Sequence, residues 1–203
     1  MVICIDAFEH PITISNHVTI WLDEYIGMMG SDEKMKEKFR QISYPLHTFD
    51  DPVKSIKFIR DNDDKKIFLI CSGVLAKEIV PIVYQLPQLY MIFIFCAQTG
   101  NHREWAIDYV EKVHIFNFDE DLLIRLTNEL ARYLMVEYNE AETRGDYNLA
   151  HGLLEWAAKL FEKADILQRN TCLQVQREVE RKINELKSKE DKQRSIIPSQ
   201  KKY

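Results

Sequence analysis

Two unbroken apolar runs constrain the fold of this chain more than any other feature of its sequence. They are KIFLIC at 66–71 and LYMIFIFC at 89–96. A strand that is apolar at every position is buried on both faces, which is typical of a parallel sheet covered by helices. The segment between the runs, 75–84, has the length of a helix, with Pro81 as a kink or boundary. The two runs therefore predict a β-α-β unit with a right-handed crossover.

Further strand and helix candidates extend this unit into a five-stranded, parallel, doubly wound sheet over residues 15–120. Strands are predicted at 17–23, 46–49 and 114–118. Helices are predicted within the polar stretch 27–41, with Ser31 as N-cap, from Pro52 onward, and at 103–110. The helix at Pro52 follows two aspartates, which is a common start signal. The predicted fold class is α/β, of the flavodoxin or receiver-like kind.

After residue 120 the pattern becomes helical. Apolar residues at helical spacing from 123 to 141 and from 149 to 164, with Arg144-Gly145-Asp146 between them, predict a helical hairpin over 121–168. Residues 169–203 are predicted to form a charged helix and a disordered tail. From Val175 to the end the chain holds nine Lys and Arg against five Asp and Glu, whereas residues 1–120 hold twelve against eighteen.

Charge, hydropathy and cysteine spacing exclude several classes of protein. The net charge of −5 argues against a nucleic-acid binder, which needs a basic face. No apolar run approaches the roughly 18 residues of a membrane span, and the first eight residues lack the basic start of a secretory signal. Four widely spaced cysteines without a C-x-x-C pair predict reduced, buried thiols. We therefore expect a soluble, cytoplasmic protein that binds neither nucleic acid nor membrane.

The hairpin resembles a tetratricopeptide repeat at its turn and second helix. The residues that match the turn glycine, the aromatic and the small packing positions of the repeat are Gly145, Asp146, Tyr147, Ala150, Leu154 and Ala157. The first helix departs from the pattern, because Tyr138 stands where the repeat prefers a small residue. Since each repeat buries its faces against stacked neighbours, this resemblance implies a lone hairpin packed on the α/β domain or the remnant of a longer array.

The α/β half resembles a small receiver-like domain. The resemblance is carried by IWLDE (20–24), PLHTFDD (45–51), IFLICSG (67–73), the IVP…LPQLYMIFIFC stretch (79–96) and Trp105. That domain is associated with multidomain animal proteins that also carry a mono-ADP-ribosyltransferase domain and tetratricopeptide repeats. Transferase activity is not implied, because the catalytic domain of that family is a separate, mainly β unit. Glu178-Val179-Glu180 lies within a charged helix here and is interpreted as a solvated face.

Ligands of open α/β sheets bind beyond the carboxyl ends of the strands, where the strand order reverses. The residues that this rule selects as crevice candidates are Asp23, Glu24, Asp50, Ser72, Gly73, Cys96 and Asn117. The acids could hold Mg²⁺, and Ser72-Gly73 could present backbone N–H groups to a phosphate. We favour a helix cap for Asp50-Asp51-Pro52 and a tight turn for Ser72-Gly73, which has no Gly-rich loop or Lys beside it. No metal and no cofactor is assigned.

Comparison with response-regulator receivers predicts a pseudo-receiver. A receiver ends its third strand in a phosphate-accepting aspartate, where this chain has Cys71-Ser72, and follows its fifth strand with a lysine, where this chain has Asn117. G-x-S-x-G, G-x-x-x-x-G-K-[ST], G-x-G-x-x-G and H-E-x-x-H motifs are also absent from the sequence.

Two functions remain open. The favoured one is a non-catalytic interaction or regulatory module that binds a protein partner, or itself, through the C-terminal helices. Val175, Val179, Ile183 and Leu186 have roughly heptad-like spacing there. The alternative is a nucleotide-binding or NAD/ADP-ribose-processing domain that uses the crevice at the strand ends. The missing catalytic motifs favour the module.

Overall fold

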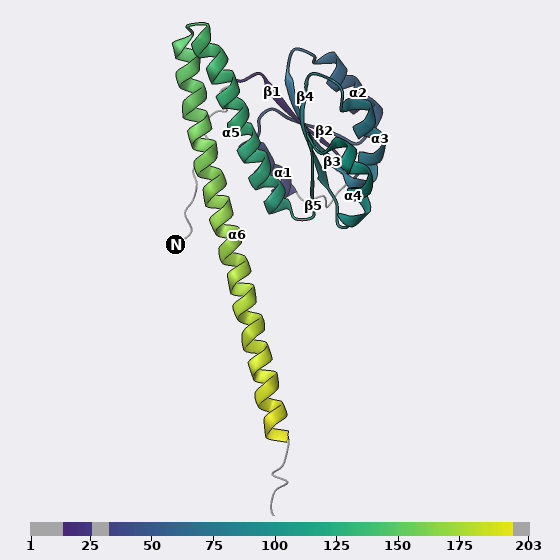
Figure 1. Cartoon of the computed structure of the whole chain (residues 1–203), viewed down its shortest axis with the longest axis vertical. Coiled ribbons are helices and arrows are strands. Elements are labelled where there is room, and N and C mark those ends of the chain that lie inside the picture. Colours follow the sequence, from purple (N-terminus) through teal and green to yellow (C-terminus); the bar gives the residue numbers. More distant parts are fainter. Residues whose placement is uncertain (1–13, 26–32, 197–203) are drawn as a thin grey trace, which may run out of the picture. The chain divides into compact units, whose positions relative to one another are not determined.

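A computed structural model describes residues 14–25 and 33–196, with side chains up to residue 189. Its centre is a five-stranded, all-parallel sheet with the strand order β2-β1-β3-β4-β5 (Figure 1). The strands are β1 (His17–Leu22), β2 (Leu46–Phe49), β3 (Lys66–Ser72), β4 (Leu89–Phe95) and β5 (Val113–Phe116). The predicted α/β class and its doubly wound parallel sheet are therefore confirmed.

Helices cover both faces of the sheet, as Figure 1 shows. One face carries α1 (Glu33–Ile42) and α5 (Asp119–Thr143), and the other carries α2 (Pro52–Asp61), α3 (Gly73–Val83) and α4 (Gly100–Ala106), which continues into the 3-10 turn η1 (Ile107–Tyr109). The predicted helix at 103–110 is thus two short elements that begin three residues earlier. Ser31, the predicted N-cap of the first helix, lies outside the described residues, which resume at Glu33.

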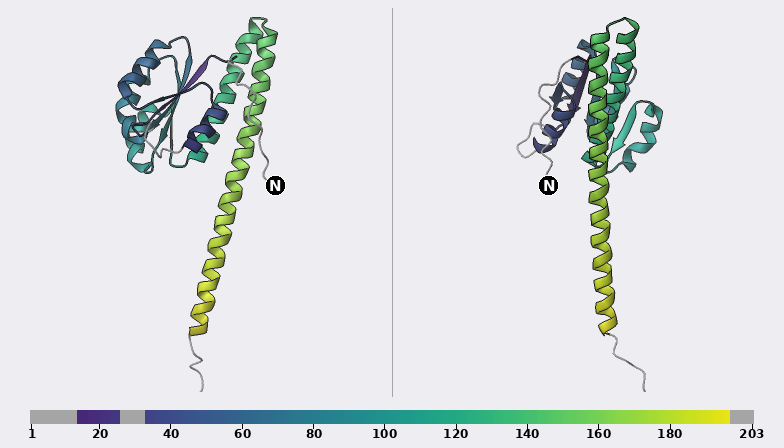
Figure 2. Two further views of the ribbon diagram at one scale, coloured as in Figure 1. Left: turned by 180° about the vertical axis from the view of Figure 1, so that it is seen from behind. Right: turned by 90° about the vertical axis from the view of Figure 1, so that its left-hand side faces the viewer.

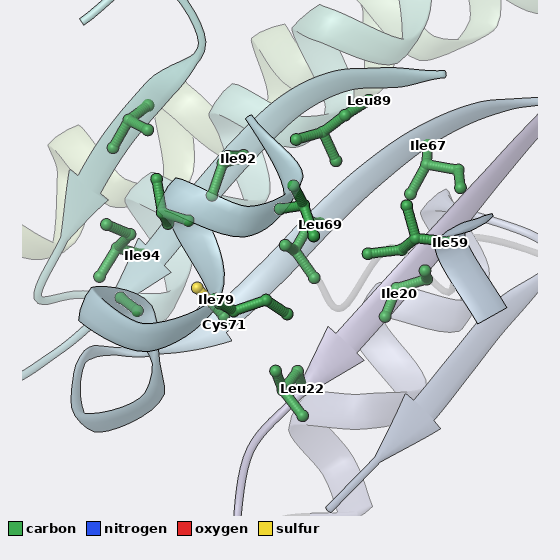
Figure 3. Packing of buried hydrophobic residues seen from close by; sticks show 14 of the residues in the cluster. Ile20, Leu22, Ile59, Ile67, Leu69, Cys71, Ile79, Leu89, Ile92 and Ile94 are labelled. Atoms are coloured by element: carbon green, nitrogen blue, oxygen red, sulfur yellow. The ribbon is translucent and has the colours of Figure 1, made fainter. Parts of the chain in front are cut away.

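The core explains why β3 and β4 have continuous apolar sequences. Successive side chains of a strand point to opposite faces of the sheet, so Leu69 packs under α2 and α3 while Phe68 packs under α5, where its ring lies 5.9 Å from that of Tyr133. Figure 3 shows the first of these layers, with Cys71 beside Ile79 of α3. Both faces of β3 are therefore buried. If apolar and polar residues alternated along this strand, the polar side chains would be buried as well.

Local sequence signals place several helix ends where they were predicted. Asp51 caps α2 by accepting the backbone N–H of Val53 at 2.8 Å, and Pro52 occupies the first helical position. Pro81 lies within the last turn of α3, which runs on to Val83. In α5 three acids fill the first turn, but the N-cap position belongs to Phe118.

The hairpin turns at Gly145, whose φ of +76° is the left-handed conformation that glycine adopts at helix C-termini. Helix α6 (Tyr147–Ile196) follows, and Asp146 accepts the backbone N–H of Leu149 at 3.1 Å. Figure 2 shows α5 and the beginning of α6 side by side from two further directions. The apolar residues that α6 buries in this part are Ala150, Leu153, Ala157, Leu160 and Ala164.

Helix α6 is one continuous helix, whereas the sequence suggested a separate charged helix after the hairpin. No glycine or proline interrupts it between 153 and 196, so backbone hydrogen bonding carries on after the apolar stripe ends. The chain divides within α6 into two compact units, Met1–Ala164 and Asp165–Tyr203. No helix within the described ranges is long and apolar enough to cross a membrane.

Candidate functional site

The carboxyl ends of the five strands form one edge of the sheet, and the strand order reverses between β1 and β3. Backbone hydrogen bonds of the sheet continue one residue past the strand ends, both between β1 and β2 and between β4 and β5. The Asp23 N–H donates to Phe49 O at 3.0 Å, and the Cys96 N–H donates to Phe116 O at 2.9 Å. Two of the residues that the sequence selected, Asp23 and Cys96, are therefore held in place by the backbone hydrogen bonding of the sheet.

The structure brings only some of these residues together. Gly73 and Cys96 are neighbours at the ends of the adjacent strands β3 and β4, and Asp23 directly follows Leu22, which pairs with Cys71 of β3. Asp50 and Asn117 follow the two outermost strands and are exposed. These two residues therefore lie at opposite sides of the sheet and do not share a pocket with the central group.

A close approach of β3, β4 and α4 defines the centre of the site. A β-carbon built on Gly73 would lie 2.6 Å from Cys96 Cβ and 2.9 Å from His102 Nε2. Only glycine leaves room for both neighbours, so the packing of Cys96 and His102 requires a glycine at position 73. The predicted tight turn at Ser72-Gly73 is in fact this direct junction, because β3 ends at Ser72 and α3 begins at Gly73.

Three buried polar atoms around this centre have no hydrogen-bond partner among the residues that the structure describes. They are Ser72 Oγ, His102 Nδ1 and Trp105 Nε1. The rings of His102 and Trp105 meet edge to face with 6.0 Å between centroids. Ser72 occupies the N-cap position of α3, yet its side chain makes no capping hydrogen bond. Because an unsatisfied buried polar group costs about 1–3 kcal/mol, each of these atoms would be stabilised by a hydrogen-bond partner.

The electrostatics do not favour a thiol nucleophile. Burial raises the pKa of Cys71 to about 12, with Cys96 and Asp23 adding to the effect. Burial also raises the pKa of Cys96, and burial followed by the charge of Lys77 lowers the pKa of His102. Thiol and imidazole are therefore both neutral at pH 7, whereas a reactive cysteine depends on its thiolate.

The acidic candidates have local structural roles. Asp51 is the cap of α2, as predicted, and Asp23 Oδ1 accepts the backbone N–H of Tyr25 at 2.9 Å, which closes a turn after β1. Glu24 hydrogen bonds to the exposed Tyr25 hydroxyl and raises its pKa. In the described part of the chain, no three His, Cys, Asp or Glu side chains are grouped as a metal site.

Sequence reasoning missed His102 as a member of this site. The only available signal was a histidine six residues after a strand-end cysteine, and that spacing has no diagnostic value. Trp105 entered only through the family resemblance. The cysteine prediction was wrong for Cys172, which is exposed; Cys71 is buried, Cys96 is half-buried, and Cys4 lies outside the described residues.

Two other surfaces could bind a partner. A cavity of about 360 Å³ lies on the outer side of α2 and α3, lined by Val53, Ile56, Lys57, Arg60, Asp61 and Ile82, and none of the predicted strand-end residues lines it. In the unit Asp165–Tyr203, one face of α6 exposes four apolar side chains. Their exposed fractions are 59% for Val175, 49% for Val179, 45% for Ile183 and 59% for Leu186.

Comparisons of the chain with protein-family models, with curated proteins and with solved structures found no match.

Proposed function

We propose that this chain is a non-catalytic interaction or regulatory module of the cytoplasm that binds a protein partner through its C-terminal helix. The observation that carries the proposal is the exposed apolar face of α6 at Val175, Val179, Ile183 and Leu186. Fully burying a side chain of this size contributes about 1.5–3 kcal/mol. Four half-exposed side chains within about three helical turns therefore supply a substantial driving force for association.

The chemistry of the strand ends supports a non-catalytic role for the α/β unit. The position at which a receiver accepts a phosphoryl group is occupied by Cys71-Ser72, and the pKa of Cys71 is raised by its burial. The position of the receiver lysine is occupied by Asn117. The α/β unit is thus a pseudo-receiver in this proposal. Acetyl phosphate should leave no stable aspartyl-phosphate on the protein, and a phosphorylated aspartate at a strand end would contradict the assignment.

Affinity capture with paired variants tests the interaction. Val175→Asp/Val179→Asp places two charges on the apolar face and should abolish retention of the partner. Gln174→Asp/Asn184→Asp adds the same charge to exposed positions on other sides of the helix and should retain it. Equal loss in both variants, or loss in neither, would contradict the proposal.

A nucleotide-binding function is the second candidate. It is favoured by Ser72 Oγ at the start of α3 and by His102 Nδ1 and Trp105 Nε1 of α4, none of which has a hydrogen-bond partner among the described residues. Thermal-shift and calorimetric titrations with NAD, ADP-ribose, ATP and GTP, each with and without Mg²⁺, test it. A ligand that binds only the folded state raises the melting temperature. A shift lost in Ser72→Ala but kept in Asn117→Ala would favour this function, whereas no shift with any nucleotide would exclude those ligands.

A further inference from the structure

The apolar face of α6 has a spacing that is symmetric about Val179. With the exposed Cys172 included, the apolar positions on this face are 172, 175, 179, 183 and 186, so the steps are three, four, four and three residues. We name these five residues the symmetric stripe. Leu173, which is also exposed, lies on a neighbouring side of the helix. Positions 172 and 183, and positions 175 and 186, are separated by 11 residues. An 11-residue repeat follows a nearly straight helix more closely than a heptad does, so the predicted heptad-like spacing is only approximate.

We propose that two copies of this chain pair through the symmetric stripe with their helices antiparallel, as the self-associating form of the proposed interaction module. A twofold axis at Val179 sets this residue against itself, Val175 against Ile183 and Cys172 against Leu186. Such an interface is isologous, because every contact occurs twice with the roles exchanged. Any stripe matches itself in a parallel pair, but only one with symmetric spacing also matches itself when one helix is reversed.

The symmetric spacing supports the antiparallel arrangement, and charges beside the stripe distinguish it from the parallel one. In a parallel pair, the residue that precedes an apolar position lies beside the residue five positions later on the partner helix. Lys182, which precedes Ile183, would therefore lie beside Lys187 of the second copy. In an antiparallel pair, residues on the same side of the stripe face each other. Glu178 and Lys182 lie on the same side, so each Glu178 comes beside Lys182 of the other copy. The parallel pair therefore sets Lys182 beside Lys187, whereas the antiparallel pair sets each Glu178 beside Lys182 and, on the other side of the stripe, Glu180 beside Glu180 of the second copy.

The length of the stripe sets the expected strength. From Cys172 to Leu186 it spans about 21 Å at 1.5 Å per residue, which is shorter than the contact of an obligate dimer. We therefore expect a weak, reversible dimer, unlike the permanent dimers that bury larger interfaces. Sedimentation of the full chain between 5 and 500 µM should show a monomer converting to a dimer. A monomer throughout this range would overturn the proposal.

Charge exchange tests the orientation. Glu178→Lys and Lys182→Glu should each weaken the dimer at least fivefold, because each sets like charges together across the pair. The double exchange should restore the dimer to within twofold of the original. Failure of the double variant to recover, or indifference to both single changes, would contradict the antiparallel register.

Cysteine cross-linking gives an independent measure of orientation. Cys172 residues of an antiparallel pair lie about 21 Å apart along the helix, so mild oxidation of the unmodified protein should give no dimer linked through Cys172. Leu186→Cys should cross-link efficiently, and Cys172→Ala/Leu186→Cys should not. A Cys172–Cys172 linkage, identified by peptide mapping, would instead indicate a parallel pair and overturn the proposal.

The outcomes separate this inference from the proposed function on which it rests. If Val175→Asp/Val179→Asp abolishes partner capture while the unmodified chain stays monomeric at 500 µM, self-pairing is wrong and the interaction module stands. If the chain dimerises but this variant still retains its partner, the partner binds elsewhere and the self-pairing stands. Gln174→Asp/Asn184→Asp should dimerise normally, and an unchanged melting temperature of both variants shows that their folds are intact.

Discussion

His102 packs so closely against Gly73 that a β-carbon on the glycine would stand 2.9 Å from His102 Nε2. The same β-carbon would stand 2.6 Å from Cys96 Cβ. Gly73 begins α3 and His102 belongs to α4, so the contact joins the first turns of two helices that follow adjacent strands. The candidate site therefore depends on the absence of a side chain at one position.

Gly73→Ala should destabilise the protein by about 1–3 kcal/mol, because β4 must shift to relieve the overlap with Cys96 Cβ. Urea unfolding followed by circular dichroism measures the change. Gly100→Ala is the matched control, since a β-carbon there meets nothing within 4 Å and alanine favours the helix that starts at this residue. Equal stability of the two variants would show that β3, β4 and α4 are not packed in this way.

Burial of His17 should make folding stability depend on pH between 6.5 and 4. Burial lowers the pKa of His17 to about 4, where it packs beside the rings of Phe68 and Tyr133. Between pH 6.5 and pH 4, His17 is protonated in the unfolded chain but not in the folded chain. The free energy of unfolding therefore falls as the pH falls through this range. The linkage is worth about 3 kcal/mol.

His17→Phe should flatten this part of the stability–pH curve, measured by urea unfolding at half-unit steps of pH. His151→Gln, a substitution of an exposed histidine on α6, should leave the slope as it is. A slope that is unchanged in His17→Phe would show that His17 titrates normally in the folded protein.

Asp51→Ala should cost about 0.5–2 kcal/mol, because the first turn of α2 loses the side-chain acceptor for the backbone N–H of Val53. Asp50→Ala removes the same charge one residue earlier, at an exposed position, and should change stability by less than about 0.5 kcal/mol. The difference in urea midpoint between the two variants is the measurement. A larger effect at Asp50 would indicate that the cap is wrongly assigned.

The three described thiols should react with iodoacetamide at very different rates at pH 7.5. Cys172 is exposed and should react quickly, whereas burial raises the pKa of both Cys71 and Cys96 and keeps their reactive thiolate scarce. Timed labelling with peptide mass spectrometry separates the sites, and labelling in urea gives the reference rates. Fast labelling of Cys96 in the folded protein would reveal an activated thiol and favour an enzyme.

Signals that act within a turn or a strand were predicted well. The runs at 66–71 and 89–96 became the buried strands β3 and β4, Asp51 and Pro52 started α2, and Gly145 closed the hairpin. The change from apolar to charged composition after the hairpin predicted a separate helix, but α6 is continuous across this change. Composition decides which face of a helix is buried, whereas glycine and proline are among the residues that signal a helix end, and neither occurs between 153 and 196.

The amino-acid sequence by itself determined the α/β class, the five strands and the acids and small residues at the strand ends, because these follow from the periodicity and caps of neighbouring residues. Only the tertiary structure decided which of them meet. The strand order separates Asp50 from Asn117, and the pairing of β3 with β4 sets Gly73 against Cys96 and His102. Such contacts depend on register between segments more than 20 residues apart, and no spacing within a segment encodes that register.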